Sequence, residues 1–157
     1  MIKFRAWVKP EILSNHMDGV IAEAKPDFIE KGCLVRRIDL KSDECFLEII
    51  DIDDVILMQS TGLKDKNGVE IFVGDIVRHS EVATDISIVR FGEFGVPNIE
   101  EQSYQDCAVG FYYENASEFK DIEPLNMTVP LNSDYVKDVL VIGNIYANPE
   151  LLNSGIE

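Results

Sequence analysis

The Asn-Gly pair at residues 67 and 68 restricts the fold more than any other feature of the sequence. Both central residues of a type I′ β-turn need a positive φ, which asparagine and glycine tolerate better than other residues. The apolar run 55–58 precedes the pair, and the short strand-like segment 70–72 follows it. We therefore predict a tight hairpin turn at Asn67-Gly68, then a bend at Gly74-Asp75 that leads into a strand over residues 76–78.

Short runs that alternate apolar with polar residues occupy much of the remaining chain. A period of two is typical of strands with one buried face. Strands are predicted over residues 2–7, 33–38, 45–50, 86–91 and 107–113, from this alternation in the first and fourth and from strand-like apolar or aromatic content in the others. The strands over residues 33–38 and 45–50 should pair as a hairpin. Gly92, Gly95 and Pro97 should end the strand over residues 86–91 and leave residues 98–106 as an exposed loop. A short helix is expected around residues 20–24.

The C-terminal part combines a strand with a helix signal. Residues 140–146 are apolar at both alternating positions apart from Asn144, which predicts an inner strand covered on both faces and makes this segment the best core candidate. Asn148 suits a helix N-cap, Pro149 the first helical position and Glu150 the first turn. These residues predict a C-terminal helix of one or two turns.

Composition and charge favour some classes of protein over others. The chain has 157 residues, of which 46% are hydrophobic and 27% charged, and this balance favours a folded domain over a disordered or fibrous chain. The net charge is −15, and nearly all of the acidic excess follows Ile50. Such a charge disfavours a groove that binds nucleic-acid phosphates.

The cysteines and the amino terminus indicate the compartment. Cys33, Cys45 and Cys107 are widely spaced and form no C-x-x-C pair, so neither a disulfide framework nor a zinc knuckle is expected. The first seven residues alternate charged with apolar side chains, unlike a secretory signal. The uncharged stretch 139–149 is too short to cross a bilayer as a helix. We expect a cytoplasmic protein that does not associate with membranes.

Acidic residues near position 51 are the best candidate for a metal site. Asp51 and Asp53 would share one face of a strand, with Asp54 adjacent, as oxygen ligands of a hard cation do. A calcium loop beginning at Asp51 would need glycine at its sixth position and an acid at its twelfth, where the sequence has Ile56 and Gly62. We interpret the acids as a solvated strand end and expect neither a metal nor another cofactor.

Catalytic residues are not indicated by any spacing in the sequence. Nucleophilic catalysis needs a base beside a Ser, Thr or Cys side chain, and the two histidines are His16 and His79. We interpret His16 as a turn residue and His79 as a surface residue at a strand end. Cys107 has no basic neighbour to activate it and is expected to be a small core residue. We therefore expect a protein that is not an enzyme.

One group of residues is nominated as an interaction surface. Trp7 and Arg5 belong to the residue types that anchor interfaces, and Gln59 and Thr61 lie on a segment that could pair beside them. The alternative is that Trp7 packs against the outside of the fold or under the long loop. The turn residues have structural roles in our interpretation and no chemistry; these are Asn67, Gly68, Gly74 and Asp75.

Three of these stretches together resemble the YopX family of phage and prophage proteins. They are residues 2–7 with Met17, residues 57–68 continuing through 70–72 and 74–77, and residues 141–146 with 148–152. The resemblance implies a mainly β fold: a small SH3-like barrel with an N-terminal β extension and a short C-terminal helix. On this basis residues 1–157 form one YopX-like domain, with a β-rich portion over 1–54 and the barrel over 55–157. The resemblance also implies self-association and no known reaction.

The leading functional hypothesis is a cytosolic protein made by phage or prophage genes that acts by self-assembly or by binding another protein. Its partners would be further copies of the chain or a host or phage protein. The alternative is an acidic mimic of nucleic acid that occupies a DNA- or RNA-binding protein of the host. Direct binding of nucleic acid is ranked below both, because the net charge opposes it.

Overall fold

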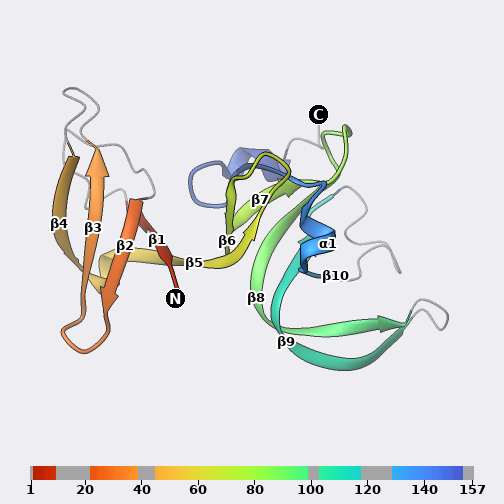
Figure 1. Ribbon diagram of the computed structural model, residues 1–157, viewed down its shortest axis with the longest axis horizontal. Coiled ribbons are helices and arrows are strands. Elements are labelled where there is room, and N and C mark those ends of the chain that lie inside the picture. The colour runs from red at the N-terminus through yellow and green to blue at the C-terminus, as the bar shows by residue number, and fades with distance from the viewer. Residues whose placement is uncertain (1, 10–21, 39–44, 99–102, 118–128, 154–157) are drawn as a thin grey trace. The chain divides into compact units, whose positions relative to one another are not determined.

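The computed structural model describes residues 2–9, 22–38, 45–98, 103–117 and 129–153. The chain divides into two compact units, Met1–Ser60 and Thr61–Glu157. Antiparallel strands build both units (Figure 1). The mainly β fold is confirmed. The strands described form two sheets, neither of which closes on itself, so the SH3-like barrel is not confirmed.

Five strands of a six-stranded sheet begin in the first unit. They are β1 (Phe4–Val8), β2 (Ala22–Asp27), β3 (Gly32–Ile38), β4 (Cys45–Asp51) and β5 (Val55–Lys64), in the order β4-β3-β2-β1-β5. β5 continues into the second unit, where it pairs with β6 (Glu70–Phe72). The strand predicted at the amino terminus and the hairpin of β3 with β4 are confirmed.

β2 corrects the prediction of a short helix around residues 20–24. Its residue Ala24 pairs with Phe4 of β1 on one side and with Val35 of β3 on the other. Two flanking strands thus satisfy the backbone of this segment, and this tertiary pairing outweighs a weak local helix signal. Residues 20 and 21 lie outside the described part of the chain.

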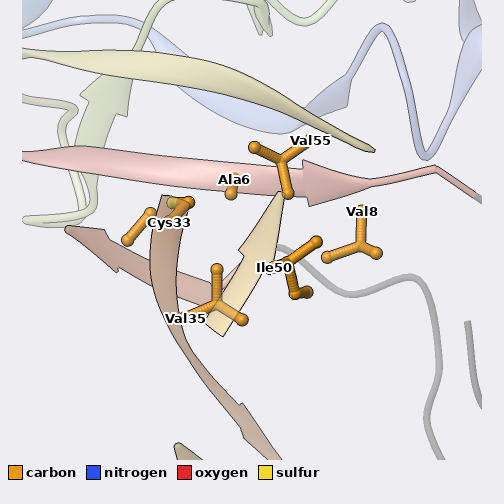
Figure 2. Close-up of a cluster of buried hydrophobic side chains, with 7 residues drawn as sticks. Ala6, Val8, Cys33, Val35, Ile50 and Val55 are labelled. Atoms are coloured by element: carbon orange, nitrogen blue, oxygen red, sulfur yellow. The ribbon is translucent and has the colours of Figure 1, made fainter. Parts of the chain in front are cut away.

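The core of the first unit lies on one face of this sheet. β1 alternates between buried Ala6 and Val8 and half-buried Arg5 and Trp7. Figure 2 shows side chains from β1, β3, β4 and β5 converging on one cluster. The cluster consists of Ala6, Val8, Ala24, Cys33, Val35, Ile50 and Val55.

The second unit is built around a five-stranded sheet. Its strands are β7 (Asp75–Arg78), β8 (Ile86–Asn98), β9 (Ser103–Asn115), β10 (Val129–Pro130) and β11 (Leu140–Asn144), in the order β10-β9-β8-β7-β11. β8 and β9 run side by side as a long, curved ribbon (Figure 1). The core here consists of Ile71, Val77, Val89, Tyr113, Val136 and Val139.

β8 and β9 are longer than the sequence suggested. β8 passes through Gly92, Gly95 and Pro97 without ending, because β9 pairs with it along almost its whole length. A shift of register between Val96 and Pro97 accommodates the proline, as β-bulges commonly do. The expected loop over residues 98–106 is therefore wrong at both ends, since β8 reaches Asn98 and β9 begins at Ser103.

β11 also differs from its prediction. It is the last strand in the order of the second sheet, and all five of its residues are half-buried. The prediction of an inner strand covered on both faces is therefore wrong. A run of apolar residues is also compatible with an edge strand that neighbouring segments cover in part.

The helices of the described residues are short. They are η2 (Ile52–Asp54) and η3 (Pro149–Asn153), both 3-10 helices, and the α-helix α1 (Ser133–Val136), which the sequence analysis missed. η3 occupies the place of the predicted C-terminal helix as a 3-10 helix, so an α-helix there is not confirmed. None of the helices described has the length and apolar character needed to cross a membrane.

Candidate interaction surfaces

The four residues nominated from the sequence do not share one surface. Arg5 and Trp7 lie on the same face of β1, opposite the core, because they alternate with Ala6 and Val8. Gln59 pairs with Phe4 and so lies on the other face of the sheet. Thr61 belongs to the second unit, where its hydroxyl donates to the carbonyl oxygen of Ile71 at 2.8 Å. Only Arg5 and Trp7 are brought together.

The Asn67-Gly68 turn has a different geometry from the one predicted. Gly68 has a φ of +81°, while Lys31 is the only non-glycine residue of the described chain with a positive φ. Asn67 is therefore outside the left-handed region, and the turn is not type I′. The Gly68 N–H donates to the Asp65 carbonyl, and the Asp65 N–H donates to the carbonyl of Val69. This pattern is typical of a type I turn followed by a glycine bulge.

Asp65 organises this turn with its carboxylate. The side chain is 5% exposed. Its Oδ1 accepts the backbone N–H groups of Asn67 at 2.8 Å and Val69 at 2.9 Å, and its Oδ2 accepts that of Val141 in β11 at 3.0 Å. Burial alone would raise the pKa of Asp65, but these three hydrogen bonds and the nearby Lys66 charge together lower it.

A second buried aspartate shapes the bend between β6 and β7. Gly74 has a φ of +95°, which favours glycine, and its N–H donates to Val89 in β8. Asp75 is 1% exposed, and its Oδ2 accepts the N–H of Phe72 at 2.8 Å. The sequence placed both residues in a bend but did not indicate that the carboxylate is buried.

The acids at residues 51–54 are arranged differently from the predicted strand face. Asp51 ends β4, and Asp53 and Asp54 belong to η2. Asp51 Oδ1 accepts the N–H of Asp53 at 2.9 Å and so caps this helix, while the Lys9 ammonium donates to the Asp53 carbonyl at 2.6 Å. Within the described ranges, no group of three or more His, Cys, Asp and Glu residues is placed to hold a metal ion.

His79 forms a polar contact that the sequence analysis missed. Its Nε2 lies 2.8 Å from the Ser87 hydroxyl, and its ring packs edge-on against Tyr113 with 4.9 Å between ring centroids. Burial lowers the pKa of His79, and the Asp85 charge partly opposes this change. Burial also raises the pKa of Tyr113 to about 12. His79 does follow a strand, but it is half-buried rather than a plain surface residue.

The Ser87 and His79 pair has the ingredients of a nucleophile with its base, but its surroundings favour a structural role. The Ser87 side chain is only 6% exposed and lies in β8, where the residue pairs with Val77 and Asn115. A substrate would have to reach a hydroxyl that is packed inside the sheet. The sequence analysis could not find this contact without the register of β7 with β8, which brings His79 and Ser87 together although they are eight positions apart.

The two cysteines with described side chains differ in exposure. Cys33 is buried in the first core, and burial raises the pKa of its thiol despite a hydrogen bond with the backbone of Lys25. Cys107 is exposed, so the prediction of a core residue is wrong. It lies in β9 opposite Gly95, on the outer stretch of the ribbon rather than beside the core.

Apolar side chains lie exposed on the outer strands of the first sheet. Leu47 and Ile49 in β4 are 72% and 76% exposed, and Leu34 of β3 pairs with Ile49 on the same face. We call these three residues the edge patch. They lie on the face opposite the core, because they alternate with buried Val35 and Ile50.

A second exposed apolar group lies on the ribbon of β8 and β9. Phe91 and Val109 are 51% and 72% exposed, and Phe111 pairs with Phe91 at 5.1 Å between ring centroids. We call these three residues the ribbon patch. They continue the face that carries Val89 and Tyr113 in the core of the second unit. Large exposed apolar groups of this kind are typical of interaction sites.

The fold and these surfaces define a mainly β protein of two units, built from open antiparallel sheets that expose apolar side chains. The chain belongs to the YopX family, because the family model described as YopX protein matches residues 3–153. The family resemblance found in the sequence is thereby confirmed.

A solved structure similar to this chain is the crystal structure of protein EF1440 from Enterococcus faecalis. The two sequences are 28% identical, and the match covers 97% of this chain and 98% of that chain with a TM-score of 0.54. A comparison with curated proteins found no significant match. The similarity therefore supports the fold over nearly the full length of both chains and assigns no activity.

Proposed function

We propose that this YopX-family chain is a non-enzymatic, cytoplasmic protein made by phage or prophage genes, and that it acts by self-assembly or by binding another protein. The observation that carries the proposal is the exposure of large apolar side chains on both units. Leu47 and Ile49 in the edge patch and Phe91 and Val109 in the ribbon patch are each at least half exposed. Covering such side chains releases water, which favours association.

The polar groups of the second unit support a non-enzymatic role. The carboxylates of Asp65 and Asp75 accept backbone N–H groups, and the imidazole of His79 is engaged with Ser87. A general base or nucleophile needs a path to its substrate, whereas Asp65, Asp75 and Ser87 are all less than a tenth exposed. These interactions stabilise turns and strand pairing.

Sedimentation velocity across micromolar concentrations tests self-assembly, and affinity capture from host lysate tests binding of another protein. We expect either a concentration-dependent increase in mass or a specific partner. For a partner, replacing Phe91 or Leu47 with lysine should weaken capture at least tenfold, as for other apolar anchors. A monomer at every concentration, together with no captured protein, would contradict the proposal.

The charge distribution favours a second candidate function, an acidic mimic of nucleic acid. Residues 51–157 contain 20 acidic and 6 basic residues, whereas residues 1–50 contain 9 and 8. An acidic surface of this strength attracts basic proteins that otherwise bind phosphates. Competition with DNA for a basic nucleic-acid-binding protein should then occur at low salt and weaken steeply as salt rises. Absence of competition at low salt would rule this function out.

A further inference from the structure

The outer half of the β8–β9 ribbon has no neighbouring strand among those that the structure describes (Figure 1). β7 pairs with β8 only as far as Ile88, and β10 pairs with β9 only at Tyr112 and Tyr113. Past the pair of Phe91 with Phe111, β8 and β9 pair only with each other. Two-stranded ribbons are marginally stable in water unless another element packs on them. A partner that covered one face would therefore stabilise this part of the ribbon.

An exposed carboxylate lies among the apolar side chains of the ribbon patch. Glu93 is exposed and pairs across the ribbon with Val109. Phe91 and Phe111 form a neighbouring pair on the same face, because residues two apart on a strand share a face and lie about 7 Å from each other. No hydrogen bond or ion pair within the described part of the chain engages the Glu93 carboxylate. The patch thus presents an unpaired negative charge to a partner.

The charge of the ribbon favours a basic partner. Residues 86–117 contain 5 acidic residues and 1 basic residue, Arg90. Arg90 lies on the opposite face, where its Nε binds Glu114 Oε2 at 2.7 Å, so it does not neutralise Glu93. A second copy would bring a like charge to Glu93 on a chain whose net charge is −15, and nucleic acids and anionic membranes would be repelled in the same way. A segment that contains arginine or lysine complements this face.

Aromatic rings beside a carboxylate suit the side chain of arginine or lysine. The rings of Phe91 and Phe111 lie edge to face, with 5.1 Å between centroids and 63° between planes. Ring faces attract cations, and long basic side chains bury their apolar stems along apolar surfaces while the charged end meets a polar group. An arginine whose guanidinium binds Glu93 has the length to lay its stem across Phe91. Because Phe91 is 51% exposed, this surface is open to such a contact.

We propose that the ribbon patch and Glu93 bind a basic segment of a partner protein, whose apolar side chains pack on the patch and whose arginine or lysine pairs with the Glu93 carboxylate. Burial of the apolar side chains favours the contact, and Glu93 selects basic segments over neutral and acidic ones. This proposal rests on the partner-binding part of the proposed function and names its surface and the chemistry of the partner.

The first test uses a short, capped synthetic peptide of alternating arginine and valine, titrated into the full chain by isothermal titration calorimetry. Two matched peptides separate the contributions: citrulline in place of arginine removes the charge and keeps the shape, and serine in place of valine removes the apolar side chains. We expect each matched peptide to bind at least about tenfold more weakly than the arginine–valine probe. Equal binding of the arginine–serine peptide would reflect attraction to net charge alone and would overturn the proposal, as would no binding of the probe.

Single variants locate the probe on the chain. Glu93→Gln and Phe91→Ala should each weaken its binding about tenfold. The matched control is Glu81→Gln, which removes the same charge from an exposed residue of the same unit outside β8 and β9. At physiological ionic strength distant charges are screened, so the control should change binding less than about threefold. Since the Glu93 side chain is exposed, Glu93→Gln should fold even if Phe91→Ala does not. Equal effects of Glu93→Gln and Glu81→Gln would overturn the proposal.

Nuclear magnetic resonance of the wild-type chain maps the probe without any substitution. Shift changes should gather at residues 91–93 and 109–111, and changes gathered on other strands would overturn the proposal. A host protein captured equally by wild type and Glu93→Gln would overturn it while partner binding stands. A dimer that Phe91→Ala dissociates would show a second copy on this face and would also overturn it. A chain that stays monomeric and captures no protein would contradict the proposed function, and this proposal with it.

Discussion

The Asp65 carboxylate accepts the backbone N–H of Val141 at 3.0 Å, which joins the hairpin turn after β5 to β11 across 76 positions of sequence. A second link reinforces it, because the Lys66 N–H donates to the Val139 carbonyl at 3.0 Å. The same carboxylate orders the turn itself through Asn67 and Val69. One buried charge therefore fixes both a local turn and a distant strand, and the sequence match to the YopX family includes both segments.

Replacing Asp65 with asparagine should destabilise the protein by about 1–3 kcal/mol, because an amide cannot accept hydrogen bonds at both of its ends and a part-buried N–H group loses its acceptor. Chemical denaturation at pH 7 measures this difference. The matched control is Asp53→Asn, since the Asp53 side chain is exposed and should contribute less than about 0.5 kcal/mol. Equal effects of the two substitutions would contradict the role assigned to Asp65.

The Asp65 contribution should also depend on pH. Its folded pKa is lowered, so the stabilisation is complete above the unfolded value of about 3.9 and is lost as the pH falls through the lower folded value. The gap in unfolding free energy between wild type and Asp65→Asn should therefore narrow below about pH 4. A gap that stays constant down to pH 2 would show that ionisation of Asp65 does not contribute.

His79 should make stability depend on pH in a higher range. Burial lowers its pKa in the folded state, so at pH values around and below about 6.5 the unfolded chain binds more protons than the folded one. Stability should then fall as the pH drops from 7 toward 5, and the slope should be smaller in His79→Gln. Unfolding free energies at half-unit steps of pH test this, and identical slopes would contradict it.

Gly143 should not tolerate even an alanine. A Cβ at this position would lie 2.6 Å from Asn148 Oδ1 and 3.0 Å from Leu151 Cδ1. The Asn148 side chain would have to move away from the Asn144 N–H that it accepts at 3.3 Å. We expect Gly143→Ala to lower the melting temperature, with a cost of about 1–3 kcal/mol. Gly110→Ala is the control, because its Cβ would make an ordinary contact of 3.8 Å with Phe94.

Local patterns predicted the strands that depend on alternation and failed where distant pairing decides the structure. The alternation in residues 2–7 predicted a strand where β1 lies, and the hairpin of β3 with β4 was predicted from its two strand-like runs. β8 continues through Gly92 and Pro97 because β9 pairs with it. The residues around Gly92 and Pro97 do not indicate which distant segment will pair with them.

The candidate surface was less predictable for the same reason. Arg5 and Trp7 share a face through the period of two, but assigning Gln59 to that face required the register of β1 with β5, which sets Phe4 opposite Gln59. A shift of one residue exchanges the two faces of a strand. Leu47 and Ile49 lie in the strand predicted over residues 45–50, yet only the strand order shows that this strand lies at an edge.

The turn at residues 65–69 provides a last prediction that separates the observed geometry from a type I′ turn. Gly68 has a positive φ, and the position that a Cβ would take there is open space, so Gly68→Ala should cost about 1–2 kcal/mol from backbone strain alone. Asn67 donates through its backbone N–H, which any residue except proline retains, so Asn67→Ala should cost less than about 0.5 kcal/mol. In a type I′ turn both substitutions would be costly, because both residues would need a positive φ. Denaturation of the two single variants distinguishes these outcomes, and a large effect of Asn67→Ala would contradict the geometry described for this turn.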